Sequence, residues 1–307
     1  MQQSTQRITL GEVGMSRVIE RQAGFGAPGD LLPTGPRELW QENRDWLAPD
    51  FWRPEQDVWV GAVQTWVLRS EGRTILVDTG VGNGRHRPSA PHFENWDTDF
   101  LDRLALAGVR PEEVDVVVNT HLHTDHVGWN TVEQDGRWVP AFPNARYLFP
   151  AADFAHLDPA RQHERPAPHG ERERLRRANE AQLFADSIAP VYEAGLAELW
   201  TDGYRIDGNL TLEPAPGHTP GSSVLRLASG GDRAVFVGDL VHSPVQILAP
   251  EHSSGFCLEP EQSAVTRRQV LSRAADQREL VIPAHFGGSG ICEVQREGSG
   301  FGIASWR

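Results

Sequence analysis

The sequence predicts an α/β protein, specifically a four-layer αβ/βα sandwich of two mixed β-sheets flanked by helices. Two observations lead to this fold class. Each half of the chain carries its own set of short apolar runs with strand character, and segments with helical spacing lie between them. No apolar run reaches the roughly 18 residues of a membrane-spanning helix, so no membrane partner is expected.

In the first half of the chain, the strands are expected near 58–68, 73–78, 114–119 and 146–149. A helix is expected over 98–107, where leucines recur near helical spacing until Gly108. A second helix begins at 150 and ends near 157, and 158–170 reads as a loop.

In the second half, helices are expected over 171–187 and 260–277. The strands expected to fill a second sheet lie near 197–201, 209–213, 223–228 and 233–238, with a last strand at 279–283. We therefore expect a single domain over 1–307.

Residues 1–55 are interpreted as an N-terminal arm, because they are rich in Gly, Pro and Trp and show little periodicity. The arm is too apolar for a disordered tail. It would either wrap the body of the domain or contact a second subunit, which leaves a homodimer open. Its apolar residues are Phe25, Leu31, Leu32, Trp40, Trp46, Phe51 and Trp52.

The net charge of −13 argues against a nucleic-acid partner, since such proteins need a basic surface for phosphates. The one arginine-dense stretch, 161–177, is interleaved with glutamates and predicts a salt-bridged surface. The two cysteines, Cys257 and Cys292, are expected to be free thiols. The first residues lack an apolar signal core, so a cytoplasmic location is expected.

The run Thr120-His-Leu-His-Thr-Asp-His126 packs four potential metal ligands into six residues: His121, His123, Asp125 and His126. Imidazole and carboxylate are common ligands of zinc and its first-row neighbours. One ion cannot easily use all four from so tight a loop, whereas two neighbouring ions can. The run follows the predicted strand at 114–119, at the end where α/β proteins tend to place their sites.

Three more candidate ligands lie where a strand gives way to a loop. His218 occupies the turn Gly217-His-Thr-Pro-Gly221, Asp239 ends the run Val235-Phe-Val-Gly-Asp, and His285 ends Leu280-Val-Ile-Pro-Ala-His. A single residue of this kind is more often structural. All of them together, in this order, point to a metal centre.

With these motifs in place, the chain resembles the metallo-β-lactamase superfamily of hydrolases over roughly 58–286. The resemblance implies that Asp239 bridges two ions and that Asp78 supports the site without binding metal. It divides the remaining ligands into His121, His123 and His218 for one ion, and Asp125, His126 and His285 for the other. Two divalent ions are implied, with zinc the first expectation and manganese, cobalt or iron as alternatives.

The implied chemistry is hydrolysis by a hydroxide that bridges the two metals. Metal charge lowers the pKa of a bound water to about 7, so the hydroxide forms near neutral pH and attacks a carbonyl carbon or phosphorus. Asp125 would orient this nucleophile as well as bind metal. No serine nucleophile motif of the Gly-x-Ser-x-Gly type is present.

Departures within the superfamily narrow the function. The true β-lactamases lack an aspartate at the position of Asp239, and flavodiiron proteins carry glutamate where this chain has His123. Glyoxalase II enzymes share the ligands but need a C-terminal helical domain, for which the short segment after His285 leaves no room. A glyoxalase-II-like thioesterase and a mononuclear iron enzyme of the persulfide-dioxygenase type remain the alternatives.

What remains is most similar to the N-acyl homoserine lactone lactonases and the methyl-parathion-type organophosphate hydrolases. In the lactonases a tyrosine lies three residues after the bridging aspartate and assists at the lactone. Here that position is His242, which either donates a hydrogen bond to the substrate or supports the metal site. The sequence thus predicts a dinuclear hydrolase of the lactonase, arylesterase or phosphotriesterase type, acting on a small ester or lactone.

Overall fold

The computed structural model describes residues 6–307. These residues form two compact units, each with its own apolar core. Unit 1 comprises 6–9, 13–20 and 64–201, and unit 2 comprises 10–12, 21–63 and 202–307. The expectation of a single domain stays a prediction.

The first sheet has the strand order β1-β2-β4-β5-β6-β9-β10, with β3 paired to β4. Its strands are β1 (Arg7–Leu10), β2 (Val13–Gly26), β3 (Trp52–Arg53), β4 (Val58–Ser70), β5 (Arg73–Val77), β6 (Val116–Val118), β9 (Arg146–Pro150) and β10 (Ala197–Trp200). The pairs β5–β6, β6–β9 and β9–β10 are parallel, whereas β4–β5 is an antiparallel hairpin, so the sheet is mixed.

The second sheet runs β11-β12-β13-β14-β15-β16-β17 in sequence order. Its strands are β11 (Tyr204–Arg205), β12 (Leu210–Pro214), β13 (Ser223–Ser229), β14 (Asp232–Gly238), β15 (Leu280–Pro283), β16 (Cys292–Glu297) and β17 (Gly300–Trp306). Only β14–β15 is parallel, because α10 connects these two strands. A separate hairpin joins β7 (Thr131–Gln134) to β8 (Arg137–Pro140).

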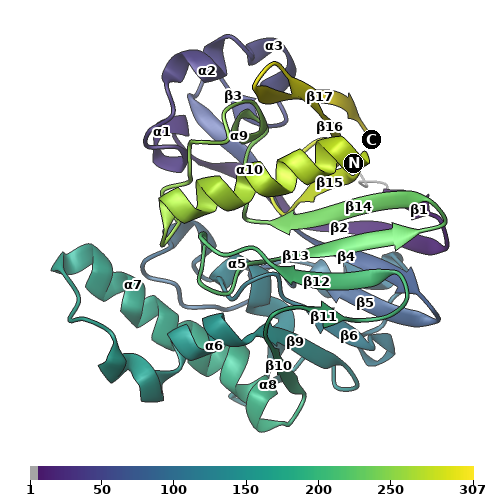
Figure 1. The fold of residues 1–307 in the computed structure, drawn as a ribbon. Helices are drawn as coiled ribbons and strands as arrows, with labels where there is room; N and C mark the ends of the chain where they lie inside the picture. Colours follow the sequence, from purple (N-terminus) through teal and green to yellow (C-terminus); the bar gives the residue numbers. More distant parts are fainter. Residues whose placement is uncertain (1–5) are drawn as a thin grey trace. The chain divides into compact units, whose positions relative to one another are not determined.

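The helices flank the sheets within their own units (Figure 1). Unit 1 carries α4 (Phe100–Leu106), α5 (Thr124–Val127), α6 (Ala151–Leu157), α7 (Gly170–Leu183) and α8 (Ala189–Glu193), with a π-helical turn at Phe184–Ile188 between the last two. Unit 2 carries α1 (Pro28–Leu31), α2 (Arg37–Gln41), α3 (Arg44–Leu47), α9 (Val245–Leu248) and α10 (Pro260–Gln277). Short 3-10 turns lie at Pro91–Phe93, Pro111–Glu113, Gly128–Asn130 and Pro159–Glu164. Helix α10 contacts β14 and β16, and α6 contacts β9 and β10.

The predicted α/β fold class, with two mixed sheets and flanking helices, is confirmed. Helix α10 begins and ends at the predicted residues. Strands β5, β6 and β9 pair in register, with Val77 opposite Val118 and Val118 opposite Leu148. Apolar residues on both faces of these strands are buried, as expected for the parallel part of a sheet. The buried strand β6 therefore delivers the ligand loop from the interior of unit 1.

One strand was assigned to the wrong sheet. The segment near 197–201 forms β10, which pairs in parallel with β9 of the first sheet and not with the second sheet. The reason is the crossover through α6, α7 and α8, which returns the chain beside β9, as parallel strands require. The loop expected at 158–170 also differs, because Pro159–Glu164 forms a 3-10 turn.

The arm is more regular than predicted and belongs to the folded core. Its first part contains β1 and the long strand β2. Trp40, Phe51 and Trp52 are buried in the core of unit 2, where Phe51 packs against Phe286 and Trp306, and Phe25 and Trp46 are partly buried against it. The two interpretations of the arm, wrapping the body or contacting a second subunit, stay predictions. No helix among residues 6–307 is long and apolar enough to cross a membrane.

Candidate metal centre

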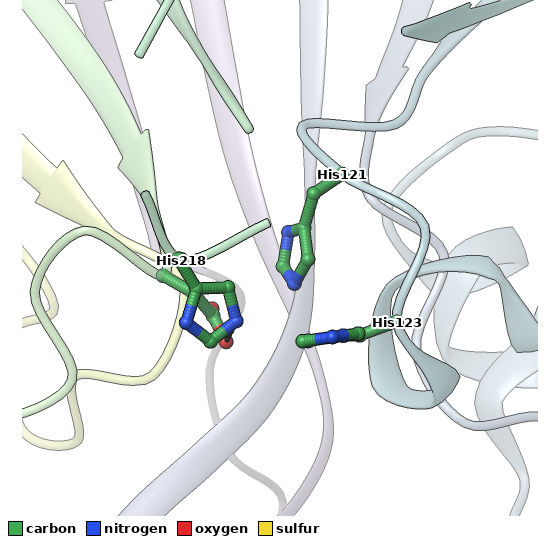
Figure 2. A group of neighbouring side chains, drawn as sticks. His121, His123 and His218 are labelled. Atoms are coloured by element: carbon green, nitrogen blue, oxygen red, sulfur yellow. Dashed lines mark ion pairs between the residues drawn. The ribbon is translucent and has the colours of Figure 1, made fainter. Parts of the chain in front are cut away.

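Four of the predicted ligands lie in unit 1, on the loop after β6 and on the first turn of α5. Figure 2 shows His121 and His123 on this loop, and their ring centroids are 4.7 Å apart. The rings of His121 and His126 lie closer, with centroids at 4.0 Å. His123 has an extended backbone and directly precedes α5, and Asp125 and His126 lie on the single turn of this helix. The loop thus gathers three imidazoles and a carboxylate.

Asp78 supports this loop from the end of β5. The backbone of Asp78 is left-handed (φ 56°), which turns the chain as the strand ends. Its carboxylate accepts a hydrogen bond from the backbone N–H of Thr120 at 2.8 Å and lies 2.9 Å from Nδ1 of His126. A carboxylate on one ring nitrogen orients the other toward a metal. This placement agrees with the supporting role that the resemblance implied for Asp78.

Two further contacts anchor the ligand loop. Asn119 donates from Nδ2 to the carbonyl of His126 at 2.7 Å, closing the loop across α5. The buried carboxylate of Asp153, on α6, accepts the backbone N–H of Leu122 at 3.0 Å. The loop is therefore held at both ends and in the middle, which limits the motion of its ligands. Sequence analysis missed Asp153, because nothing near it in the sequence points to the loop.

The other predicted ligands lie in unit 2 and surround one carboxylate. Asp239 follows β14 and His285 follows β15. His218, labelled in Figure 2, lies in the turn after β12. Oδ2 of Asp239 lies 3.2 Å from Nε2 of His218, whereas Oδ1 lies 2.9 Å from Nε2 of His285. Nε2 of His242 is 3.1 Å from Oδ2. The two oxygens of Asp239 thus face different imidazoles.

The backbone fixes the orientation of His285. Its Nδ1 lies 2.9 Å from the carbonyl oxygen of Ala62, and the N–H of Ala62 donates to the carbonyl of His285, also at 2.9 Å. Ala62 lies on β4 within unit 2. This pair of hydrogen bonds makes Nδ1 the protonated nitrogen and leaves Nε2 as the potential ligand atom.

The pKa values of His218 and His242 are shifted in opposite directions. Burial alone would lower the pKa of His218, but the charge of Asp239 and its hydrogen bond raise it to about 9. For His242, burial outweighs the attraction of Asp239 and lowers the pKa to about 4. His242 is therefore a neutral imidazole near neutral pH. It can offer one N–H to a neighbour and no positive charge.

His242 is buried, and its Nδ1 has no hydrogen-bond partner among residues 6–307. Its backbone is fixed, because its N–H donates to Oε1 of Gln246 at 2.7 Å. The ring packs against Phe256, at 6.0 Å between centroids, and stacks on His285 at 5.5 Å. Together with Asp239 and His285 it forms a group whose ligand atoms lie within 4.8 Å of one another, a spacing that could hold a metal ion.

Phe256, an aromatic neighbour of His242, is open to solvent, with 51% of its surface exposed. Trp129 and Phe286 also flank ligand loops in the sequence, but both are buried in their unit cores. An exposed phenyl ring beside a buried polar imidazole is a suitable contact for an apolar group of a small molecule.

A family model described as the metallo-beta-lactamase superfamily matches residues 58–285. The chain belongs to the metallo-beta-lactamase superfamily. The match covers most of the chain and includes every predicted ligand. No curated protein matches the sequence.

Solved structures of the superfamily share the fold over nearly the full length. The hydrolase AbOPH matches with a TM-score of 0.81 and 23% identity, covering 99% of this chain and 98% of its own. AidC, described as a dizinc quorum-quenching lactonase, matches with a TM-score of 0.79 and 21% identity over 99% and 97% of the two chains. A probable metal-dependent hydrolase from Staphylococcus aureus matches at 0.76, with 15% identity and 97% and 98% coverage. At these identities the likeness establishes the fold.

Proposed function

We propose that this protein is a dinuclear metal-dependent hydrolase that cleaves a small ester or lactone, with organophosphate triesters as a side activity. The metallo-beta-lactamase fold and the histidine and aspartate clusters support a metal-dependent hydrolase. In this proposal the ligands fall into three groups: His121, His123 and His218 for one ion, Asp125, His126 and His285 for the other, and Asp239 as the bridge.

The arrangement around Asp239 carries the proposal. Its Oδ2 faces His218, proposed for one ion, and its Oδ1 faces His285, proposed for the other. A carboxylate that presents one oxygen to each partner is suited to bridging two cations. A divalent ion offers each carboxylate oxygen a stronger electrostatic partner than an imidazole does.

The donor set fits divalent first-row metals. Imidazole nitrogen and carboxylate oxygen suit zinc, manganese, cobalt and iron, and no thiolate belongs to the proposed set. Nδ1 of His126 faces Asp78 and Nδ1 of His285 faces a backbone carbonyl, so both Nε2 atoms are set as ligand atoms. We put zinc first, as in the dizinc lactonase AidC.

Two divalent ions held in this way would supply an activated water and polarise the oxygen of a scissile carbonyl or phosphoryl group. In our proposal Asp125 orients that water as well as binding metal. His242, a neutral imidazole whose Nδ1 has no hydrogen-bond partner among residues 6–307, donates an N–H to the substrate or to the leaving oxygen. Phe256 packs against the apolar part of the substrate.

A lactone or an aryl ester is the proposed substrate class. AidC and a second lactonase of this fold are described in complex with N-hexanoyl homoserine products, which shows that the fold accommodates acyl lactones in those proteins. AbOPH is described only as a hydrolase. The histidine at position 242, where lactonases carry tyrosine, argues for a substrate range wider than homoserine lactones.

Two alternatives make different forecasts. A glyoxalase-II-like thioesterase would prefer glutathione thioesters over oxygen esters. A mononuclear iron enzyme of the persulfide-dioxygenase type would contain one ferrous ion and consume oxygen. Metal analysis separates the latter from the hydrolase, because two equivalents of zinc, manganese or cobalt support our proposal.

We also propose a cytoplasmic location and a small molecule as the only obligatory partner. The two free thiols support this location.

The test is a hydrolysis panel of lactones, aryl esters, phosphotriesters and a glutathione thioester. It is run on protein that has been stripped with a chelator and then reconstituted. We expect stripping to abolish turnover and zinc, cobalt or manganese to restore it. Magnesium, which prefers oxygen ligands, serves as the control ion and should restore little. Unchanged turnover after verified removal of metal would disprove the mechanism.

A further inference from the structure

The second ring nitrogen of His218 faces a thiol. Nδ1 of His218 lies 3.5 Å from Sγ of Cys257. The corresponding nitrogens of His126 and His285 face a carboxylate and a backbone carbonyl, both at 2.9 Å. Carboxylates, carbonyls and water are the usual partners of metal-ligating histidines. His218 therefore differs from the other two in the chemical nature of its partner.

The thiol is held in place by hydroxyl groups. Sγ of Cys257 lies 3.4 Å from Oγ of Ser254 and 3.5 Å from Oγ of Ser263. Ser263 in turn accepts a hydrogen bond from Nη2 of Arg267 at 3.1 Å. A thiol can donate its own hydrogen to Ser263 and still accept one from an imidazole N–H. The geometry thus allows Cys257 to act as an acceptor for His218.

Arg267 makes this support rigid. Its guanidinium is fully buried on α10 and donates to the carbonyl oxygens of Leu240 and Pro250, at 2.5 Å and 2.6 Å. Leu240 follows the proposed bridging residue Asp239. One buried side chain therefore connects the loop after β14 with the serine that contacts Cys257.

The backbone around His218 is fixed to the same segment. Its carbonyl accepts the N–H of Leu258, and the carbonyl of Gly217 accepts the N–H of Glu259, both at 2.9 Å. Gly217 has a φ of 131°, and a Cβ there would lie 2.3 Å from the backbone nitrogen of Ser263. Only glycine allows the turn to approach the start of α10 this closely. Ring and backbone of His218 are thus both anchored to 257–263.

We propose that Cys257 is a positioning residue of the metal centre, which accepts the Nδ1–H of His218 and so directs its Nε2 toward Asp239 and the metal. This inference rests on the proposed function, because it requires His218 to be a ligand. Cys257 itself binds neither metal nor substrate. Its role is to fix the tautomer and the ring angle of one ligand.

The test compares zinc affinity and the visible spectrum of the cobalt form in Cys257→Ala and Cys257→Ser. Loss of such an outer partner typically lowers metal affinity by about 10- to 100-fold. We expect Cys257→Ala to weaken one of the two zinc sites by about that factor and to shift the cobalt bands. Cys257→Ser keeps an acceptor and should recover most of the affinity. Cys292→Ala, which removes the other free thiol, on β16, is the matched control and should bind zinc normally.

Several outcomes would overturn the inference. One is a folded Cys257→Ala protein with the zinc affinity and cobalt spectrum of the wild type. Another is equal weakening in the alanine and serine variants, which would mean that packing and not the hydrogen bond matters. If Cys257→Ala does not fold, Cys257→Val fills the same space without accepting a hydrogen bond and takes its place. A wild-type protein that binds none of zinc, cobalt and manganese would refute the proposed function itself, whereas the first two outcomes leave it standing.

Discussion

Asp239 is the residue on which the proposed centre depends most, because its two oxygens face different imidazoles. Asp239→Ala should therefore lose turnover and both metals together. His285→Ala removes a ligand of one ion only and should mainly lower the stoichiometry toward one. Metal content per chain, measured beside activity, checks both expectations. His163→Ala, an exposed histidine on the 3-10 turn of unit 1, is the control and should change neither. Two tightly bound metals in Asp239→Ala would show that the bridge is assigned wrongly.

Substitution of His242 tests whether this residue donates a hydrogen bond to the substrate. If His242 donates a hydrogen bond to the substrate, His242→Ala should lower turnover while both metals stay bound. A single oxyanion donor is worth roughly 2.7–4 kcal/mol, and since His242 would share its substrate with two cations, we expect about a ten-fold loss. His242→Tyr, the lactonase residue, should raise the lactone-to-phosphotriester activity ratio.

The measurement is metal content together with that two-substrate ratio. A histidine that merely supports the metal site predicts the reverse pattern, in which metal is depleted and all substrates suffer alike. That result would remove His242 from the catalytic group and leave it a supporting residue, in keeping with its 3.1 Å contact to Asp239.

At the residue scale, motif spacing pointed to the candidate ligands and the resemblance to the supporting residue Asp78, but neither pointed to the other contacts of the site. The loop at 121–126 and the strand ends at Asp239 and His285 carry their chemistry in local sequence. Asp153 and Ala62 lie far along the chain from the residues they hold, and only the fold brings them close. Cys257 was visible as a free thiol, yet nothing in its neighbourhood pointed to His218.

At the scale of elements, helix α10 was predictable because its start is marked by Pro260 and its length by sustained helical spacing. Strand β2 was not, since Arg17 and Glu20 are buried within it and interrupt the apolar pattern. Glu20 accepts hydrogen bonds from the backbone of Val81 and from Trp129, so its burial has a structural reason. Polar residues with such partners cannot be recognised from sequence.

The C-terminal hairpin was missed although its signal was present. In β16 the buried residues Cys292 and Val294 alternate with less buried ones, and Gly298 adopts φ 56° in the turn to β17. Alternation bounded by a glycine turn is a hairpin pattern. By contrast, which sheet β10 joins is determined by the three helices that connect it to β9, and the four residues of β10 carry no signal of this.

Cys292 gives β16 a measurable pH dependence. Burial raises the pKa of its thiol from 9.0 to about 12. Its protonated form therefore stabilises the fold fully below pH 9, and this stability is lost as the pH rises from about 9 to about 12. One pKa unit corresponds to about 1.4 kcal/mol, so the wild type should lose about 2 kcal/mol more than Cys292→Ala between about pH 8 and about pH 10.5.

Denaturant unfolding of both proteins at the two pH values checks this. Cavity formation in the variant cancels in the comparison, because its cost does not depend on pH. Tyr147, whose pKa burial also raises, is present in both proteins and cancels as well. Parallel loss of stability in the two proteins would mean that the Cys292 thiol ionises in the folded state.

At the scale of the whole molecule, the fold class could be predicted from the two sets of strands and from the order of the candidate ligands, because both are visible in the sequence. Each unit has its own buried core, one built on β4–β6 and β9, the other on the arm and the second sheet. The proposed ligands are divided between them, with four residues in unit 1 and three in unit 2. A centre that uses all seven must link the stability of both units.

Metal should therefore stabilise the entire chain against heat. A ligand present at about 100 times its dissociation constant adds about 2.7 kcal/mol to the free energy of unfolding. Calorimetry of the zinc form should show a transition several degrees above that of the stripped protein. Asp239→Ala is the control, since zinc should no longer raise its midpoint. If the stripped and zinc-loaded proteins unfold at the same temperature with the same profile, the metal does not draw ligands from both units, and the dinuclear assignment fails.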